Sequence, residues 1–478
     1  MKLKKNLFIV ICLLLAVGLT GCKKDIKLRF VVISDVHMSR SAYSHEALTR
    51  VLKNLLEKKP LPDAIFVCGD FTENGWIGEY DAFNTIFADR SIVPEGVEVY
   101  LMMGNHEHRK TCFVDDLQAE TDCSPLAQKN FRLERLRSVE RFTEMTGQPL
   151  HQYIDIKGYP FITISETEGD NLVGSIPDKD VMLNLYDENS LQFLAEKLAD
   201  ASRSYPGKPI FLFAHIGSTS TNFGTFPQDD GGQKLFPPLL EGYPQLVFFN
   251  GHSHFPIGDP RSIHQERYTS INAGSANGGT AITYYIPAPY IPNQSNSTCT
   301  EGLIVNVLSD GTVEIERWDA FRNEEMTPCW RLEPPFDGSR FAYANRNGLP
   351  APVFGANATV TGNIIGSDLM VRFTKATDNE VVNHYYIELL EEDGTVLYAG
   401  NQYSLFYMNS QTPEIYAIRI RLSGDSSPVS LPPCKTFQIR VTAVDSYGNR
   451  STPIMSERLA IPPSFLKEME FHPYVDNS

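Results

Sequence analysis

Positive charge is scarce along this chain of 478 residues. Lysine and arginine together number 42 against 58 aspartates and glutamates, so the formal net charge at pH 7 is −16. Proteins that grip a nucleic-acid backbone need a basic footprint. We therefore expect no nucleic acid binding. A small phosphorylated substrate remains possible, because a bound cation can outweigh the field of the whole protein.

Long hydrophobic runs are scarce as well. Residues 7–17 form an apolar run that is shorter than the roughly 18 residues of a membrane helix, and Lys2, Lys4 and Lys5 precede it. With Leu19-Thr20-Gly21-Cys22, residues 1–22 resemble the signal peptide of a bacterial lipoprotein, which implies that Cys22 carries lipid. We expect an extracytoplasmic protein, periplasmic or at the cell surface, that a lipid anchor holds on the membrane. An ordinary secretory signal with an incidental cysteine is the alternative.

Cysteines do not have the spacing of a zinc finger. Cys12 would leave with the signal and Cys22 would be lipidated, and six remain: Cys68, Cys112, Cys123, Cys299, Cys329 and Cys434. An exported protein can form disulfides. Cys112 with Cys123 is one candidate pair and Cys299 with Cys329 a weaker one, whereas Cys68 lies in an apolar run and is expected to be a buried thiol.

The sequence also lacks a serine or cysteine nucleophile motif, a phosphate-binding glycine-rich loop and internal repeats. What it has instead is five short polar segments. They are Asp35-Val-His37, Gly69-Asp70, Gly104-Asn105-His106-Glu107, His215 and Gly251-His252-Ser253-His254. Together they supply imidazoles, carboxylates and an amide oxygen, the mixed nitrogen and oxygen set that holds a pair of transition-metal ions.

Each of these segments follows a run that predicts a strand. The expected strands before them are 30–33, 64–67, 97–103, 210–214 and 246–250, and further strands are expected at 161–165, 268–272, 280–286, 302–308 and 313–318. Helical periodicity appears at 44–59, 131–145 and 187–205. Near-continuous apolar strands between helices indicate an α/β fold, in which sites form at the carboxyl ends of strands.

In these residues the chain resembles the calcineurin-like metallophosphoesterase family over residues 28–319. The resemblance implies an α/β/β/α sandwich of two mixed sheets. It also implies that Asp35, His37, Asp70 and His254 hold one divalent ion, and that Asp70, Asn105, His215 and His252 hold a second. Manganese, iron and zinc all suit this set. Purple acid phosphatases of the same superfamily have a tyrosine ligand three residues after the bridging aspartate, where this chain has Glu73, so an iron–tyrosinate centre is not expected.

The expected reaction is hydrolysis of phosphomonoesters or phosphodiesters by attack of a metal-bridged hydroxide. His106 would be the catalytic residue that contacts the phosphate or protonates the leaving group. Arg109 follows the Asn-His motif and is a candidate substrate-binding residue, although a solvated charge is an alternative for it. The oligomeric state is not predicted.

Beyond residue 319 helical patterns cease. Residues 320–350 are rich in proline, glycine and charge and are expected to be a linker or strap, residues 351–463 an all-β domain, and residues 464–478 a tail. The segment Phe437–Asp445 with the turn after it resembles an immunoglobulin-like fibronectin type III module. A catalytically silent surface lipoprotein that binds through this module is the alternative to an enzyme, and the intact ligand set argues against it.

Overall fold

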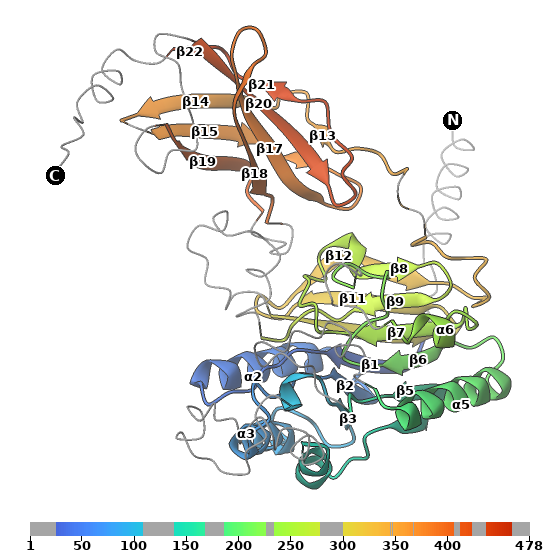
Figure 1. Cartoon of the computed structure of the whole chain (residues 1–478). Helices are drawn as coiled ribbons and strands as arrows, with labels where there is room; N and C mark the ends of the chain where they lie inside the picture. The colour runs from blue at the N-terminus through green and yellow to red at the C-terminus, as the bar shows by residue number, and fades with distance from the viewer. Residues whose placement is uncertain are drawn as a thin grey trace, which may run out of the picture.

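The computed structural model describes residues 25–108, 138–167, 186–225, 234–277, 300–344, 346, 348–366, 368–405, 412–422 and 436–460. Within these ranges the chain forms an N-terminal α/β part of two sheets and a C-terminal part made of strands (Figure 1).

The first sheet is mixed, with six strands in the order β12-β11-β10-β1-β2-β3. The strands are β1 (Ile26–Ile33), β2 (Ala64–Cys68), β3 (Glu98–Met102), β10 (Glu301–Leu308), β11 (Val313–Asp319) and β12 (Glu324–Leu332). β1, β2 and β3 are parallel, whereas β10, β11 and β12 continue the sheet in antiparallel fashion. All residues of β2 and β10 are buried, which explains why they are near-continuous apolar runs.

The second sheet is also mixed and has the order β4-β5-β6-β7-β9-β8. Its strands are β4 (Gln152–Ile156), β5 (Tyr159–Thr163), β6 (Ile210–Phe213), β7 (Leu246–Asn250), β8 (Ile263–Gln265) and β9 (Thr269–Asn272). β5, β6, β7 and β9 are parallel, and the edge strands β4 and β8 are antiparallel to their neighbours.

Three apolar cores hold these layers together. Helices α2 (Ala42–Leu56) and α3 (Ile77–Ala88) pack on the first sheet, and helices α5 (Glu188–Ser204) and α6 (Pro237–Leu240) pack on the second. Figure 1 shows α2 and α3 beside β1 to β3, and α5 beside β5 and β6. The core between the sheets is aromatic, with the Phe66 and Phe213 rings stacked at 4.0 Å. The predicted α/β domain with mixed sheets is therefore confirmed.

The C-terminal part consists of two main sheets, β14-β15-β19 and β18-β17-β20-β21, with β22 beside β20 and a short β13-β16 pair. Its strands are β13 (Val353–Phe354), β14 (Val360–Ile365), β15 (Asp368–Thr374), β16 (Ala376–Thr377), β17 (Val382–Leu390), β18 (Val396–Tyr403), β19 (Ile415–Arg421), β20 (Thr436–Asp445), β21 (Ile454–Met455) and β22 (Leu459–Ala460). One apolar core includes residues of both main sheets. This is consistent with the predicted all-β module, and its assignment as a fibronectin type III domain stays a prediction.

Some elements differ from the prediction. Residues Glu324–Leu332, expected within the linker 320–350, form β12, because a strand at the edge of a sheet tolerates Pro328. Helix α3 was not predicted, and helix α2 begins at Ala42, after an N-cap at Ser41, rather than at residue 44. The strand expected at 280–286 and the tail 464–478 lie outside the described residues.

The two described cysteines are free. Cys68 is buried in β2, as expected, and burial raises the pKa of its thiol well above the ordinary value. Cys329 contacts the carbonyl oxygen of Ile315 at 3.3 Å. Cys299, its weakly predicted partner, and the pair Cys112 and Cys123 lie outside the described residues.

Candidate metal centre

The seven predicted ligands meet where the two sheets face each other. Asp35, Asp70 and Asn105 follow β1, β2 and β3 of the first sheet, while His215 and the pair His252 and His254 follow β6 and β7 of the second. The carboxyl ends of parallel strands lie at one edge of a sheet, which is why segments far apart in sequence converge here.

The backbone at this edge is in an unusual conformation. Nine described residues other than glycine have positive φ, and five of them are predicted ligands, with φ 53° at Asp35, 46° at His37, 48° at Asp70, 64° at His252 and 51° at His254. Such a conformation is uncommon for residues with a Cβ and clusters at functional sites. The fold therefore holds these side chains in directions that ordinary strand ends do not provide.

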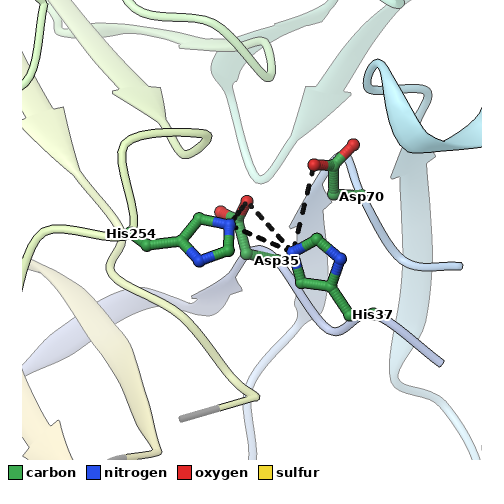
Figure 2. A group of neighbouring side chains, drawn as sticks. All are labelled: Asp35, His37, Asp70 and His254. Atoms are coloured by element: carbon green, nitrogen blue, oxygen red, sulfur yellow. Dashed lines mark hydrogen bonds and ion pairs between the residues drawn. The ribbon is translucent and has the colours of Figure 1, made fainter. Parts of the chain in front are cut away.

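The first group of candidate ligand atoms surrounds Asp35 (Figure 2). Asp35 Oδ1 lies 2.9 Å from His254 Nε2 and 3.8 Å from His37 Nε2. The two imidazole nitrogens are 3.0 Å apart, and Asp70 Oδ2 lies 4.0 Å from His37 Nε2. One small volume is thus lined by two carboxylates and two imidazoles.

The second group shares Asp70 with the first. Asp70 Oδ2 lies 3.1 Å from His215 Nε2. The side-chain oxygen of Asn105 lies 3.1 Å from His215 Nε2 and 3.2 Å from His252 Nδ1. The predicted ligands therefore form two adjacent groups with a carboxylate common to both.

The close approach of these carboxylates and imidazoles shifts their pKa values. Burial by itself would raise the pKa of Asp35, but neighbouring imidazoles, His254 above all, lower it to about 2. Burial opposes the charged form of His215, yet Asp70 raises its pKa well above the usual value. Burial and the nearby His215 lower the pKa of His252 to about 4, so His252 is neutral at pH 7. Both aspartates are ionised at neutral pH, since the pKa of Asp70 is also low.

Asn105 shows that the site fits a cation. Its amide oxygen faces both carboxylate oxygens of Asp70 and ring nitrogens of His215 and His252, all within 3.3 Å. Without a cation, the amide would gain by turning its NH₂ group toward the Asp70 carboxylate and His252 Nδ1. With a cation among them, the oxygen is correctly placed as a ligand, and the hard and borderline donors suit manganese, iron(II) or zinc.

Two glycines leave room for this arrangement. A Cβ on Gly104 would lie 2.6 Å from His215 Cδ2 and 2.7 Å from the backbone nitrogen of Asp70. A Cβ on Gly251 would overlap the side chains of Ser34 and Asp35. Side chains of predicted ligands pack against both positions, so a larger residue there would displace them.

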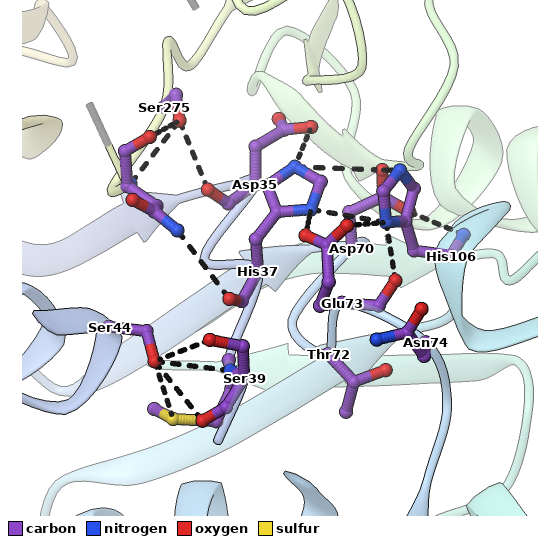
Figure 3. Close-up of polar contacts among 12 residues, drawn as sticks. Asp35, His37, Ser39, Ser44, Asp70, Thr72, Glu73, Asn74, His106 and Ser275 are labelled. Atoms are coloured by element: carbon purple, nitrogen blue, oxygen red, sulfur yellow. Dashed lines mark hydrogen bonds and ion pairs between the residues drawn. The ribbon is translucent and has the colours of Figure 1, made fainter. Parts of the chain in front are cut away.

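His106, the predicted catalytic residue, lies beside His37 and Asp70 (Figure 3). It is buried on the short helix η1 (His106–His108), and its Nε2 lies 3.7 Å from Asp70 Oδ2. Its Nδ1 lies 2.8 Å from the carbonyl oxygen of Glu73. The Glu73 carboxylate in turn lies 3.1 Å from His37 Nδ1, so this glutamate contacts a predicted ligand and the predicted catalytic histidine.

Glu107 holds the backbone of the segments that bear two predicted ligands. The Glu107 carboxylate accepts hydrogen bonds from the backbone N–H groups of Asp70, Thr72 and Gly104 at 2.7–3.1 Å. Burial and the Asp70 charge raise the pKa of Glu107 to about 8.

Sequence reasoning missed the support that follows β9. The Ser275 hydroxyl donates to the Asp35 carbonyl oxygen at 3.0 Å, and the Asn277 side chain donates to that of His37 at 3.5 Å. These bonds run to backbone atoms 240 residues away, for which no local sequence signal exists.

Two predicted residues fall outside the described part of the chain: Arg109, expected to bind substrate, and Cys22, expected to carry lipid. Among the described residues, no helix has the length and apolar character to span a membrane.

Comparisons with known proteins agree on the chemistry of the α/β part. Residues 28–256 match the family model of the calcineurin-like phosphoesterases. A protein of Arcobacter nitrofigilis named as a probable glycerophosphodiester phosphodiesterase, GpdQ, is 25% identical over 213 residues, which cover 40% of this chain and 72% of that protein.

Solved structures are more distant. A purple acid phosphatase from yellow lupin, Lupinus luteus, matches with a TM-score of 0.40 and 15% identity, over 65% of this chain and 54% of that one. The twitchin kinase region of C. elegans matches 21% of this chain and 15% of its own, with a TM-score of 0.14 and 18% identity. Residues 28–256 thus resemble the calcineurin-like phosphoesterases, and the protein is a hydrolase that acts on phosphoric ester bonds.

Proposed function

We propose that the protein is a dinuclear metal-dependent phosphohydrolase that acts outside the cytoplasm, anchored by lipid on Cys22. One observation carries the dinuclear assignment: the two groups of predicted ligands share the Asp70 carboxylate. A single ion would need only one group, whereas a bridging carboxylate is the usual way to hold two ions roughly 3.5–4 Å apart.

The ligand roles follow from the contacts. Asp35, His37, Asp70 and His254 would hold one ion, and Asp70, Asn105, His215 and His252 the other. When bound, the two ions would supply a nucleophilic water at neutral pH and neutralise charge on the phosphoryl oxygens. Glu107 and Ser275 keep the chain segments that bear Asp70 and Asp35 in place.

His106 is proposed to be the residue that transfers a proton to the substrate. A carbonyl oxygen only accepts, so the bond to Glu73 requires the hydrogen to be on Nδ1 of His106. Nε2 faces Asp70 and can then hold a proton or release it toward a phosphate oxygen or a leaving alkoxide. General acid catalysis of this kind contributes about 100- to 10,000-fold to a rate.

The expected substrate is a small phosphoester. The name of the Arcobacter relative points to a phosphodiester, and the choice between diester and monoester is the main question for experiment. The metal would be manganese, iron(II) or zinc, and Glu73 in place of a tyrosine disfavours an iron–tyrosinate centre.

The test is hydrolysis of an aryl phosphodiester and the matching monoester by the purified protein, after chelation and after return of Mn²⁺, Fe²⁺ or Zn²⁺. We expect chelation to abolish turnover and one of these ions to restore it, with the diester preferred. The His106→Ala variant should keep its metal and lose about 100-fold or more in kcat.

Asp70→Asn serves as the second variant, because it removes the shared ligand and should abolish both turnover and binding of the metal pair. A stoichiometry of one ion per chain in the unmodified protein would contradict the dinuclear assignment. Two bound ions without turnover of either ester would instead favour the silent binding protein.

A further inference from the structure

The loop that carries His252 and His254 ends at a buried carboxylate. Asp259 is fully buried and caps the short helix η4 (Pro260–Ser262), where its Oδ1 accepts from the backbone N–H of Arg261 at 2.9 Å. Only four residues separate Asp259 from His254, so the position of this side chain constrains the loop.

Residues of both parts of the chain satisfy this carboxylate. The Arg261 guanidinium donates to its two oxygens at 2.9 and 2.8 Å. Asn383 of β17 donates to Oδ2 at 3.2 Å, and the hydroxyl of Ser446, directly after β20, donates to Oδ2 at 3.1 Å. Asn383 and Ser446 are themselves buried. The C-terminal sandwich therefore completes the hydrogen bonds of a buried charge in the phosphoesterase domain, where a lost donor is costly.

From Asp259 the contacts lead back to the metal ligands. The Arg261 guanidinium lies 3.8 Å from the centre of the Phe223 ring and 5.5 Å from that of Phe255. The two rings are 4.1 Å apart, and Phe223 N donates to the Arg261 carbonyl oxygen at 3.1 Å. Phe255 adjoins His254, and Phe223 lies on the loop that follows His215. Arg261 thus ties together the loops that bear three candidate ligands.

A second contact shows that the sandwich is held firmly. Arg346, between the two parts, donates to the Pro260 carbonyl oxygen and to the Tyr447 hydroxyl, both at 2.7 Å, and forms an ion pair with Glu380. Its guanidinium also lies 5.7 Å from the centre of the Tyr447 ring. Pro260 directly follows Asp259, so both contacts act on the same turn.

We propose that the C-terminal sandwich is a positioning element of the metal centre: through Asn383 and Ser446 it fixes Asp259 and Arg261, and through them the loops of His215, His252 and His254. The proposal rests on the dinuclear site proposed above. His254 belongs to one group of ligands and His252 to the other, so a displaced loop weakens the binding of both ions. A module that served only as a spacer or a separate binding domain would have no such effect.

The experiment titrates Mn²⁺ into the chelated full-length protein by calorimetry and compares it with the double variant Asn383→Ala/Ser446→Ala. We expect both binding steps to weaken, by about 3- to 10-fold, which is less than the effect of removing a direct partner of a ligand. Ser446→Thr keeps a hydroxyl and should bind Mn²⁺ like the unmodified protein.

The matched control is Arg440→Gln. Arg440 of β20 forms an ion pair with Glu388 of β17 at 2.6 Å, so its loss perturbs the same two strands without touching Asp259. We expect a lower melting temperature and unchanged Mn²⁺ affinity. If the double variant does not fold, Ser446→Ala alone, which removes one hydroxyl, provides the comparison.

Equal Mn²⁺ affinity of the folded Asn383/Ser446 variant and the unmodified protein would overturn the positioning role and leave the metal site intact. Weakened binding in the Arg440→Gln control as large as in the double variant would also overturn it, because general destabilisation would then explain both. If the unmodified protein bound none of Mn²⁺, Fe²⁺ and Zn²⁺, the metal site itself would be overturned, and the positioning role with it.

Discussion

At the scale of single residues, side chains from distant parts of the sequence hold the candidate ligands in place. Aspartate, asparagine and histidine at strand ends carry their chemistry in their identity and spacing. Glu107, Ser275 and Asp259 act through hydrogen bonds to backbone atoms or to distant side chains, and such partners leave no local pattern. The five positive φ values at ligand positions are equally invisible, since nothing in an aspartate or histidine indicates that conformation.

Glu73 offers a test at this scale. Its carboxylate contacts Nδ1 of His37, and the contact keeps Nε2 of that ring directed at Asp35. We expect Glu73→Gln to weaken Mn²⁺ binding by about 10-fold, because the neutral amide orients the imidazole less firmly and makes it less basic. Calorimetric titration measures this.

The comparison for Glu73 is Glu333→Gln, which removes an exposed carboxylate that pairs with Arg340 at 3.3 Å. It should leave Mn²⁺ affinity unchanged. An unaltered affinity in Glu73→Gln would show that His37 is held by its other contacts alone.

At the scale of elements, burial decided which strands could be predicted. β1, β2, β6 and β7 are buried on both faces and therefore read as apolar runs. Helix α3 was not predicted because Gly78, Asp81, Asn84 and Thr85 are poor helix formers that interrupt its apolar pattern. Strand β12 was not predicted because its proline and charged residues are typical of a linker.

Gly104, in the turn after β3, offers a test of the packing around the site. Its φ is not positive, so a substitution there acts through steric contacts and not through backbone strain. We expect Gly104→Ala to lower stability by about 1–3 kcal/mol, since the new Cβ would push against Asp70 and the His215 ring. Displacement of two ligands should also weaken Mn²⁺ binding by roughly 10-fold or more. Thermal unfolding and calorimetric titration measure the two effects.

Gly242→Ala is the matched substitution, because a Cβ at Gly242 meets nothing within 4 Å. Its stability should stay within about 0.5 kcal/mol of the unmodified protein. A Gly104→Ala protein that behaves like Gly242→Ala would mean that the ligands relax without loss, against the tight packing described for this turn.

At the scale of the whole molecule, the sequence predicted two parts but not their relation. The donor and acceptor atoms that join them belong to residues 124 and 187 positions apart, so no pattern could link Asp259 to Asn383 and Ser446. Only the folded chain shows that Asp259, close to His252 and His254, accepts hydrogen bonds from the C-terminal part.

The last prediction concerns the stability of the whole protein as a function of pH. Asp70 raises the pKa of His215 in the metal-free protein, so the protonated imidazole stabilises the fold fully below its unfolded pKa. That stabilisation is lost as the pH rises through the higher folded value. A bound cation replaces the proton, so the metal-loaded protein does not suffer this loss, and protons compete less with the cation at higher pH.

We therefore expect the difference in melting temperature between Mn²⁺-loaded and chelated protein to grow from about pH 6 to about pH 8.5. At about 1,000 times the Kd, a bound ion stabilises the folded state by about 4 kcal/mol, which calorimetry resolves easily. Asp70→Asn removes the partner that raises the His215 pKa and should show a small difference that does not vary with pH. A difference that shrinks as the pH rises in the unmodified protein would mean that Mn²⁺ does not displace the His215 proton, and that this imidazole is not a ligand.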